Sequence, residues 1–436
     1  MRGGLLWLSL ICLCCVAAAS GGSAVDVKTV LLQDFDFYHT TDQIHHRLNQ
    51  LSQSCPDLTL SERRNGSASI DVVTVRKKGV EPINRVFMLF GEHARELISP
   101  ETGLYMIEAL CQSPTVKNKK LLKEAKHVLE STMFSIVVNG NPQSRRRVEE
   151  GEYCVRVNEH GVDLNRNWDD HWTSESNLGP DTNPGAKPFS EPETAIFLNL
   201  VEEVKPTTFV TVHSGTFGMY QPWAYEQKEA PRNAQRMSKI LRALDAKHCT
   251  CPFGAAAVQV GYPCPGTSLD FVYDKLDPPA NYAFAFEIYT SPSRTVGLKE
   301  RYELAMRKQS TVDEQDAASF VAVATRASFL RKKKHKRTAR ARVTPDGRVL
   351  FDEGIGGLWN YNPVDGSSMT PEQCMEQFNP QSRKDYDRTV SVWATVFIEL
   401  AQMVSDDKSH THKLEEHPLL FQSRSKEGCF GTKDKV

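Results

Sequence analysis

The sequence predicts an α/β fold: one domain in which a central, mixed but mostly parallel and twisted β-sheet is flanked by helices on both faces. Short runs of β-branched and aromatic residues, bounded by turn residues, alternate with helix-like stretches along most of the chain. The composition is that of a globular protein, because 40% of the 436 residues are hydrophobic and 25% are charged. The net charge of −1 gives no global reason to expect a nucleic-acid partner or a membrane surface.

The predicted strands are identified by their β-branched and aromatic residues and by the turn residues around them. Five stretches have this pattern: residues 70–75, 86–90, 133–138, 208–212 and 283–288. We find no internal repeat. Strands that alternate with helices favour parallel pairing, since a parallel connection has to cross back over the sheet.

Four helices are predicted between and after these strands. The sequence SPE at residues 99–101 has the pattern of an N-cap at Ser99 followed by proline and an acid, and it predicts a helix to about residue 111. The sequence SEPE, beginning at Ser190, predicts a second helix start with a capping box. Amphipathic spacing predicts the remaining helices over residues 233–248 and 385–404.

The N-terminus has the pattern of a secretory signal peptide. Arg2 is followed by an apolar stretch over residues 5–16 and then by small residues at 17–20, so we expect cleavage within residues 19–24. The alternative is a membrane anchor, but the apolar run is shorter than the roughly 20 residues that span a bilayer. The sequence therefore predicts a secreted, extracellular or vacuolar-lysosomal protein with no membrane span after cleavage.

The cysteines agree with an oxidising compartment. Removal of the leader leaves eight: Cys55, Cys111, Cys154, Cys249, Cys251, Cys264, Cys374 and Cys429. An even number in a secretory chain predicts disulfides, although the sequence does not give their connectivity. The CxC pair at 249 and 251 would also suit a metal, but no second pair lies at zinc-finger spacing, so we favour structural cystines.

A candidate metal-ligand set lies at two predicted strand ends. The sequence FGEHARELISP places His93 and Glu96 after the strand at 86–90, and His213 follows the apolar run 209–212. Alone, HxxE is weak, because 13 His and 54 Asp plus Glu make chance pairs common. However, sites in open α/β sheets form at the carboxyl ends of strands. Two closely spaced ligands with a distant third are typical of a single catalytic Zn²⁺, and the imidazoles disfavour calcium or magnesium.

A catalytic base and a substrate-binding segment are also indicated. The sequence NYAFAFEIYT places Glu287 at the end of an apolar strand, where burial would raise the pKa of its carboxyl towards the general-base range. The alternative is a glutamate at the solvent edge of the strand. The sequence RVNEHGVDLNRNW adds adjacent asparagines and arginines, which supply the donors that bind a carboxylate.

The motifs HARE, GVDLNRNW, HSG and FEIY, in this order, resemble the zinc metallocarboxypeptidases of the carboxypeptidase A (M14) family. The resemblance covers roughly residues 35–404. It implies a zinc-dependent exopeptidase, a peptide hydrolase that removes the C-terminal residue of peptides or proteins. On this resemblance His93, Glu96 and His213 correspond to the zinc ligands, and Glu287 corresponds to the general base.

The resemblance implies further roles in the GVDLNRNW region. Asn165 and Arg166 correspond to the pair that binds the terminal carboxylate of the substrate. Arg156 fits the arginine that polarises the scissile carbonyl, with the arginines at 145–147 as alternatives. Asp163 corresponds to a carboxylate that orients a zinc-binding histidine.

The segment GYPCPGTSLDFVYD resembles the part of the family that carries the mobile, substrate-capping tyrosine. The match makes Tyr262 that residue, with Tyr273 as the alternative, and places Leu269 in the specificity pocket. By a looser match Ala224 also lies there. Basic-specific members have an acid in this pocket, so two uncharged residues imply a preference for apolar or aromatic C-terminal residues. Asp270 corresponds to an acid that apolar-specific members also have.

These interpretations divide the chain into a signal peptide over residues 1–24, a zinc carboxypeptidase domain over 25–405 and a polar C-terminal tail over 406–436. A basic insertion is expected at about 305–368. Its densest run, residues 331–342, predicts a solvated loop; the alternatives are a polyanion-binding site or a site of proteolytic processing.

Two functions from different classes follow. The first is a monomeric zinc carboxypeptidase that acts on peptide or protein C-termini; variants of it remove acidic or basic residues. The second is a zinc-retaining binding protein whose basic run 331–342 binds polyanions. Retention of Glu287 favours the enzyme, because a binding protein does not need the general base.

Overall fold

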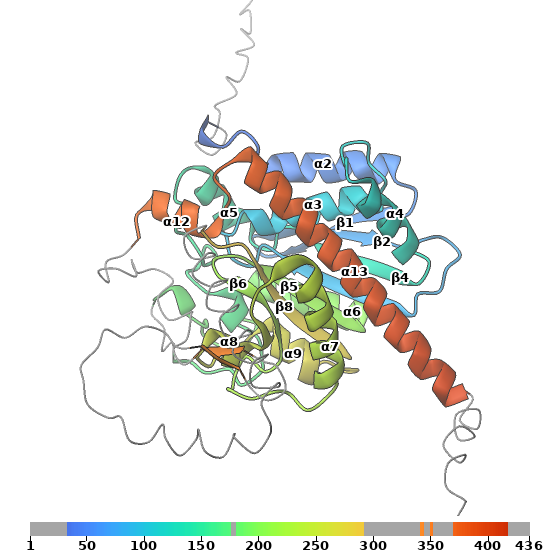
Figure 1. Ribbon diagram of the computed structural model, residues 1–436. Helices are drawn as coiled ribbons and strands as arrows, with labels where there is room; N and C mark the ends of the chain where they lie inside the picture. The colour runs from blue at the N-terminus through green and yellow to red at the C-terminus, as the bar shows by residue number, and fades with distance from the viewer. Residues whose placement is uncertain (1–32, 176–179, 292–340, 344–348, 352–368, 417–436) are drawn as a thin grey trace, which may run out of the picture.

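The computed structural model describes residues 33–175, 180–291, 341–343, 349–351 and 369–416 (Figure 1). The predicted signal peptide, most of the basic insertion and the end of the predicted tail, with Cys429, lie outside these ranges. An eight-stranded sheet has the order β1-β2-β4-β3-β5-β8-β6-β7. Its parallel pairs are β4–β3, β3–β5, β5–β8 and β6–β7, and the other pairs are antiparallel. The predicted mixed, mostly parallel sheet is confirmed.

The five predicted strands are present with small shifts at their ends. They are β2 (Ala68–Val75), β3 (Asn84–Phe90), β4 (Thr132–Val137), β5 (Thr208–His213) and β8 (Tyr282–Ile288). Three strands were not predicted: β1 (Leu58–Asn65), β6 (Phe217–Gln221) and β7 (Phe253–Ala255). β1 is polar at an edge, and β6 and β7 contain glycine, so none of them has the apolar run that identifies the central strands.

Helices cover both faces of the sheet (Figure 1). On one face α13 packs against α3, α4, α7 and strand β3, whereas α6 and α9 pack against strands from the other face. The main helices are α2 (Thr41–Ser54), α3 (Ile98–Leu110), α4 (Lys119–Val128), α5 (Pro142–Glu149), α6 (Pro192–Val204), α7 (Ala234–Leu244), α8 (Ala256–Val260), α9 (Ser268–Asp274), α12 (Pro371–Phe378) and α13 (Arg383–Glu416).

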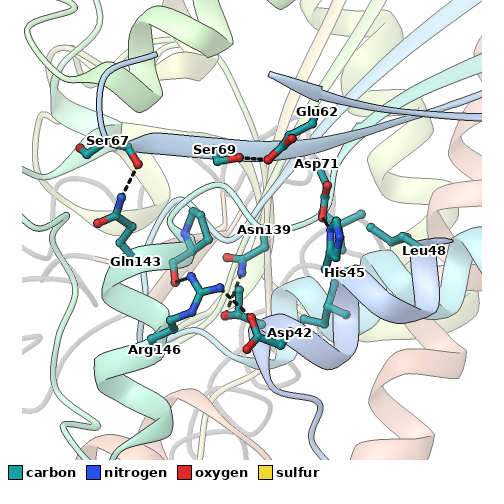
Figure 2. A pocket seen from close by; sticks show the side chains of 14 residues that line it. Asp42, His45, Leu48, Glu62, Ser67, Ser69, Asp71, Asn139, Gln143 and Arg146 are labelled. Atoms are coloured by element: carbon teal, nitrogen blue, oxygen red, sulfur yellow. Dashed lines mark hydrogen bonds and ion pairs between the residues drawn. The ribbon is translucent and has the colours of Figure 1, made fainter. Parts of the chain in front are cut away.

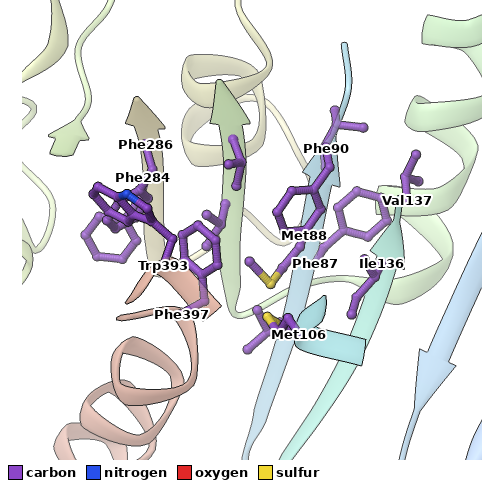
Figure 3. Packing of buried hydrophobic residues seen from close by; sticks show 14 of the residues in the cluster. Phe87, Met88, Phe90, Met106, Ile136, Val137, Phe284, Phe286, Trp393 and Phe397 are labelled. Carbon is purple, nitrogen blue, oxygen red and sulfur yellow. The ribbon is translucent and has the colours of Figure 1, made fainter. Parts of the chain in front are cut away.

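The core between α13 and the sheet is aromatic (Figure 3). Phe397 of α13 packs edge-on against Phe90 of β3 and Phe286 of β8, with ring centroids 5.9 and 5.4 Å apart. All three side chains are at most 1% exposed. Burying an aromatic side chain of this kind stabilises the fold by roughly 1.5–3 kcal/mol. The packing fixes β3 and β8, the strands that lead to His93 and Glu287.

Both predicted N-caps are wrong. α3 begins at Ile98, so Ser99 lies inside the helix; its hydroxyl donates to the carbonyl of Val212 at 2.6 Å and accepts from the amide of Gly91 at 3.2 Å. α6 has Glu191 as its N-cap residue, without a side-chain cap. The Ser190 hydroxyl instead donates to the Glu191 carboxylate. In both places a tertiary contact or a neighbouring carboxylate replaced the local cap that the sequence pattern predicted.

Two segments differ from the sequence prediction: a helix extends into the predicted tail, and two short strands lie within the predicted basic insertion. α13 continues past residue 404 to Glu416, into the segment where the sequence predicts the polar tail. Short strands β9 (Ala341–Val343) and β10 (Val349–Phe351) form a separate two-stranded sheet that packs against α8. Among the residues that the structure describes, no helix has the length and apolarity needed to cross a bilayer.

Three disulfides are present in the described ranges: Cys55–Cys111, Cys154–Cys374 and Cys249–Cys251. The first joins the ends of α2 and α3, and the second joins the loop before Arg156 to α12. The third joins the two cysteines of the CxC pair, so the prediction of cystines there is confirmed, although their partner was not predicted. Cys264 is buried and forms no disulfide with another cysteine of the described ranges.

Candidate metal centre and active site

Three neighbouring parallel strands deliver the candidate site residues to one edge of the sheet. β3 ends at Phe90, three residues before His93, and β5 ends at His213 itself. In the register of β5 and β8, His213 lies directly beside Glu287. Since parallel strands end at the same edge, sequence segments more than a hundred residues apart meet here.

The turn between β3 and α3 is fixed by backbone contacts. Gly91 adopts a φ of +71°, and a Cβ there would lie 2.9 Å from the ring of Pro100 and 3.2 Å from the amide of Gly140. Only glycine meets both demands at low cost. The resulting sharp turn places His93 and Glu96 above the strand ends, and the amide of Ser214 donates to the Glu96 carboxylate at 3.1 Å.

His93, Glu96 and His213 form a compact set of donor atoms, called here the metal-ligand cluster. His93 Nδ1 lies 2.8 Å from Glu96 Oε1, and His213 Nδ1 lies 3.2 Å from Glu96 Oε2. The two Nδ1 atoms are 3.1 Å apart. The three side chains are at most 5% exposed. Two facing imidazole nitrogens and a carboxylate fit one divalent ion of the zinc type, because each offers a lone pair towards the same point.

Asp163 and Arg156 lie beside His93. Asp163 Oδ1 is 3.1 Å from His93 Nε2, and its Oδ2 accepts from Arg156 Nε and Nη2 at 3.0 and 2.9 Å. Burial favours the neutral form of this carboxyl, but the charges of Arg156, His93 and Arg166 together outweigh it and hold the pKa of Asp163 well below its usual value. Arg156 Nη1 is 3.6 Å from Glu96 Oε1. The guanidinium therefore borders the metal-ligand cluster.

The arginines at 145–147, which are the alternatives to Arg156, pair with acids outside the metal-ligand cluster. Arg145 is buried against Glu101 and Glu149, Arg146 pairs with Asp42, and Arg147 pairs with Glu152. Arg156 is thus the arginine of the four that contacts the metal-ligand cluster.

Glu287 is a partly buried carboxylate that lies beside His213 in the register of β5 and β8. Its Oε2 accepts from the amide of Thr216 at 3.4 Å. Burial, and then the negative charge of Glu96, raise the pKa of Glu287 to about 7. A carboxylate with this pKa can take and return a proton near neutral pH.

The predicted carboxylate-binding residues lie next to the cluster. Asn165 Nδ2 is 3.3 Å from His213 Nε2, and Arg166 is buried with a raised pKa. Burial opposes the rise for Arg166, and nearby Cys264 and Asp163 favour its charged form. Close approach of the chain at Gly266 holds this segment, since a Cβ there would lie 2.3 Å from the carbonyl oxygen of Arg166.

Of the two tyrosines, the structure brings Tyr262 towards these arginines. Tyr262 is partly buried and close enough to both Arg156 and Arg166 to favour their charged forms. Tyr273, by contrast, is 1% exposed, and its hydroxyl donates to the carbonyl of Arg232 and accepts from the amide of that residue, both at 2.7 Å. It has no freedom to cap a substrate.

The predicted pocket residues are buried and uncharged. Leu269 on α9 and Ala224 are 2% and 5% exposed. Asp270 accepts from the amide of Ala224 at 3.0 and 2.9 Å and from that of Tyr225 at 2.8 Å. Burial raises the pKa of its carboxyl to about 8. The Asp270 carboxylate is therefore already hydrogen-bonded to backbone amides.

Sequence reasoning missed Ser268, which supports Asn165. Its amide and hydroxyl lie 2.9 and 3.1 Å from Asn165 Oδ1. A serine at the start of α9, after the glycine at 266, carries no signal of its own in the sequence; only the fold brings it beside Asn165.

Two other polar features of the described residues differ from the metal-ligand cluster. Asp245, Cys249 and Cys251 also offer converging donor atoms, but the disulfide uses both sulfurs. A polar groove of about 450 Å³ lies between α2, α5 and the β1–β2 hairpin (Figure 2). Asp42 pairs with Arg146 and His45 pairs with Asp71 across it, Glu62 pairs with Arg64 outside it, and no residue of the metal-ligand cluster lines it.

The fold and the donor set together define a class of protein. The family model described as zinc carboxypeptidase, peptidase family M14, matches residues 44–305, more than half of the chain. The chain belongs to the M14 zinc carboxypeptidase family.

Individual relatives are similar at a lower level of identity. Zinc carboxypeptidase A 1 of Anopheles gambiae is 27% identical over 279 residues, which are 58% of this chain and 60% of that protein. Carboxypeptidase A2 of Mus musculus is 27% identical over 58% of this chain and 63% of its own length. The chain therefore spans about three fifths of these relatives. The crystal structure of carboxypeptidase A from Helicoverpa armigera shares the fold, with a TM-score of 0.50, 19% identity and coverage of 61% of this chain and 70% of that one.

Proposed function

We propose that this protein is a zinc-dependent metallocarboxypeptidase that hydrolyses the last peptide bond of peptides or proteins. The observation that carries the proposal is the convergence of His93 Nδ1, His213 Nδ1 and the Glu96 carboxylate on one point, with Glu287 and Arg156 beside them. Membership of the M14 zinc carboxypeptidase family supports the same activity.

The chemistry follows from the positions of these side chains. Zinc held by His93, Glu96 and His213 would supply a Lewis acid that polarises the scissile carbonyl and lowers the pKa of water. Glu287 accepts the proton of the attacking water and returns it to the leaving amine. The Arg156 guanidinium faces the same region and stabilises the negative charge that develops on the carbonyl oxygen.

Exopeptidase specificity comes from the group of side chains that binds the free carboxylate. Asn165, Arg166 and Tyr262 provide donors and positive charge on one side of the cluster, and Arg166 is the residue suited to bind a carboxylate with two hydrogen bonds. Holding the terminus there places only the last peptide bond over the catalytic groups.

We further propose a preference for apolar or aromatic C-terminal residues. Leu269 and Ala224 are uncharged, and the hydrogen bonds to Asp270 from the Ala224 and Tyr225 amides leave that acid unsuited to pairing with a substrate lysine or arginine. The three disulfides support synthesis through the secretory pathway, since disulfides persist in oxidising compartments.

The full chain, produced in a secretory host, tests these proposals on blocked dipeptides that end in Phe, Arg or Glu. We expect chelator-sensitive release of Phe, and loss of that release in Glu287→Gln. Preferential release of Arg or Glu would contradict the proposed pocket but leave the mechanism intact. Zinc binding without release of any residue would contradict the proposed activity.

A further inference from the structure

Glu92 is a buried carboxylate that the proposed mechanism does not use. It lies between Gly91 and His93 in the turn after β3 and is 1% exposed. Within the part of the chain that the structure describes, its one salt-bridge partner is His213, with Glu92 Oε2 3.4 Å from His213 Nε2. A carboxylate buried without a lysine or arginine is costly unless another positive charge offsets it.

The contacts of Glu92 lead to the second histidine of the metal-ligand cluster. The Thr211 hydroxyl donates to Glu92 Oε2 at 2.6 Å, and the same hydroxyl oxygen lies 2.8 Å from His213 Nε2. Since its proton goes to Glu92, the Thr211 oxygen can accept the Nε2 proton of His213. Glu92 therefore holds this ring edge both directly and through Thr211.

The arrangement repeats the one on His93. Each histidine turns Nδ1 towards the other ligands and Nε2 towards a buried carboxylate, Asp163 at 3.1 Å from His93 and Glu92 at 3.4 Å from His213. A proton on Nε2 leaves Nδ1 with its lone pair free for a metal. Carboxylates that accept from a ligand histidine fix its tautomer and strengthen its binding to the metal.

The charges also differ between the two carboxylates. Arg156 neutralises Asp163, with contacts of 2.9 and 3.0 Å, whereas no arginine of the described ranges pairs with Glu92. A zinc ion carries two positive charges, and Glu96 offsets one of them. Glu92 is placed to offset the other across the His213 ring.

We propose that Glu92 is a positioning residue for the metal: it orients His213 through Thr211 and raises the zinc affinity of the site. This inference rests on the proposed zinc site. Glu92 also reaches the substrate-binding side, because the Ser268 hydroxyl lies 3.3 Å from Glu92 Oε2 and 3.1 Å from Asn165 Oδ1.

The test is the zinc dissociation constant of the full chain, measured by competition with a chromophoric chelator. Glu92→Gln keeps the shape and a carbonyl acceptor but removes the charge, and we expect zinc to bind about 10- to 100-fold more weakly. Thr211→Val removes the intervening hydroxyl and leaves the direct contact, so we expect a smaller weakening.

The matched control is Glu108→Gln. Glu108 is also buried and also accepts from a threonine, Thr115, at 2.9 Å, but it pairs with Arg47 at the far end of α3. Its substitution is expected to leave zinc affinity unchanged. Thermal unfolding of metal-free protein supplies a second readout: Glu92→Gln is expected to keep the wild-type midpoint and to lose part of the increase that zinc produces.

Each contrary result identifies which of the two proposals is wrong. Wild-type zinc affinity in Glu92→Gln, or an equal loss in Glu108→Gln, would overturn the role of Glu92 and leave the proposed function standing. A fall in the metal-free midpoint as large as the fall in the zinc-bound midpoint would show that Glu92 serves the fold. If the wild-type chain binds no zinc, both proposals are wrong.

Discussion

Two buried polar clusters lie near the start of α3, one in the turn that leads into it and one on its first turn, and they are built in opposite ways. In the metal-ligand cluster, the two Nδ1 atoms and the Glu96 carboxylate, all of which can bind a metal, face one another. In the second cluster, called here the α3 anchor, every close contact to the central carboxylate comes from a donor. The anchor consists of Glu101 with the residues around it: His39, Arg145 and Tyr386.

Both oxygens of the Glu101 carboxylate accept hydrogen bonds within the anchor. Glu101 Oε1 accepts from the His39 amide at 2.8 Å and from Arg145 at 3.4 Å, and Oε2 accepts from the Tyr386 hydroxyl at 2.6 Å. Burial opposes ionisation, yet the charge of His39 and its other partners lower the pKa of Glu101. The cluster ties α3 to α5, α13 and the segment before α2, so its role is structural.

The contacts around the two glutamates show how a metal site can be distinguished from a structural network. Both clusters bury a glutamate of α3 or its leading turn, and both contain histidine. The two clusters differ in what surrounds the glutamate: two imidazole nitrogens 3.1 Å apart offer a site for a shared cation beside Glu96, whereas hydrogen-bond donors already surround Glu101.

The largest effect is expected for Glu287→Gln, which leaves the metal-ligand cluster intact. Loss of the general base is expected to lower kcat by about 10²- to 10⁴-fold. Zinc affinity is expected to stay at the wild-type value, because Glu287 is not one of the three ligands. Steady-state kinetics on a dipeptide ending in Phe, with the zinc content of each sample, check both. A variant with near-wild-type kcat would contradict the assigned base.

Glu101→Gln is expected to have the opposite result, a loss of stability without a loss of zinc. Removing one partner leaves Arg145 buried without full compensation, at a cost of about 3–5 kcal/mol. Urea unfolding of metal-free protein measures this change. The exposed pair between Arg63 and Glu203 gives the control, since Glu203→Gln is expected to cost about 0–1 kcal/mol. Equal losses of unfolding free energy in Glu101→Gln and Glu203→Gln would contradict the structural role of the α3 anchor.

The pH dependence of catalysis is expected to report Glu287. The base acts when deprotonated, so kcat/KM is expected to rise as the pH passes upward through the pKa of Glu287. Burial and Glu96 place that pKa at about 7, and the charge of a zinc ion would lower it, so the midpoint is expected between 4.5 and 7. A kcat/KM that stays constant over this range would contradict the assignment.

A smaller pH effect is expected at the anchor. The charge of Glu101 raises the pKa of His39, so the folded state binds a proton more tightly than the unfolded state. The resulting stability is fully present below about pH 6.5 and is lost as the pH rises through the raised value. The difference in unfolding free energy between wild type and His39→Gln is therefore expected to shrink with rising pH. A difference that grows would contradict the pairing.

The sequence predicted the parts of the fold that local patterns encode. Apolar runs identified β3, β5 and β8, and with them the positions of His93, His213 and Glu287 at one edge of the sheet. Short amphipathic or polar elements such as α2 and β1 were missed, because their apolar residues are few and their packing partners are distant in sequence.

Individual hydrogen bonds between distant segments, apart from those at the strand ends that form the site, could not be predicted. The Ser99 hydroxyl binds the carbonyl of Val212, so a residue with the pattern of an N-cap became a link between β5 and α3. No sequence pattern predicted the contact of Glu92. Its neighbour in the sequence is His93, but its contact is with His213, and the pairing of β3 with β5 brings these two residues together. Disulfide connectivity depends on the same long-range placement.

The most direct test of the central claim is reconstitution of metal-free protein with zinc. We expect that release of Phe is absent without metal and returns in proportion to added zinc, reaching its maximum at one zinc ion per chain. In Glu101→Gln the same stoichiometry is expected at temperatures where the variant is folded. Full activity in metal-free protein, or no recovery after zinc binds, would contradict the account.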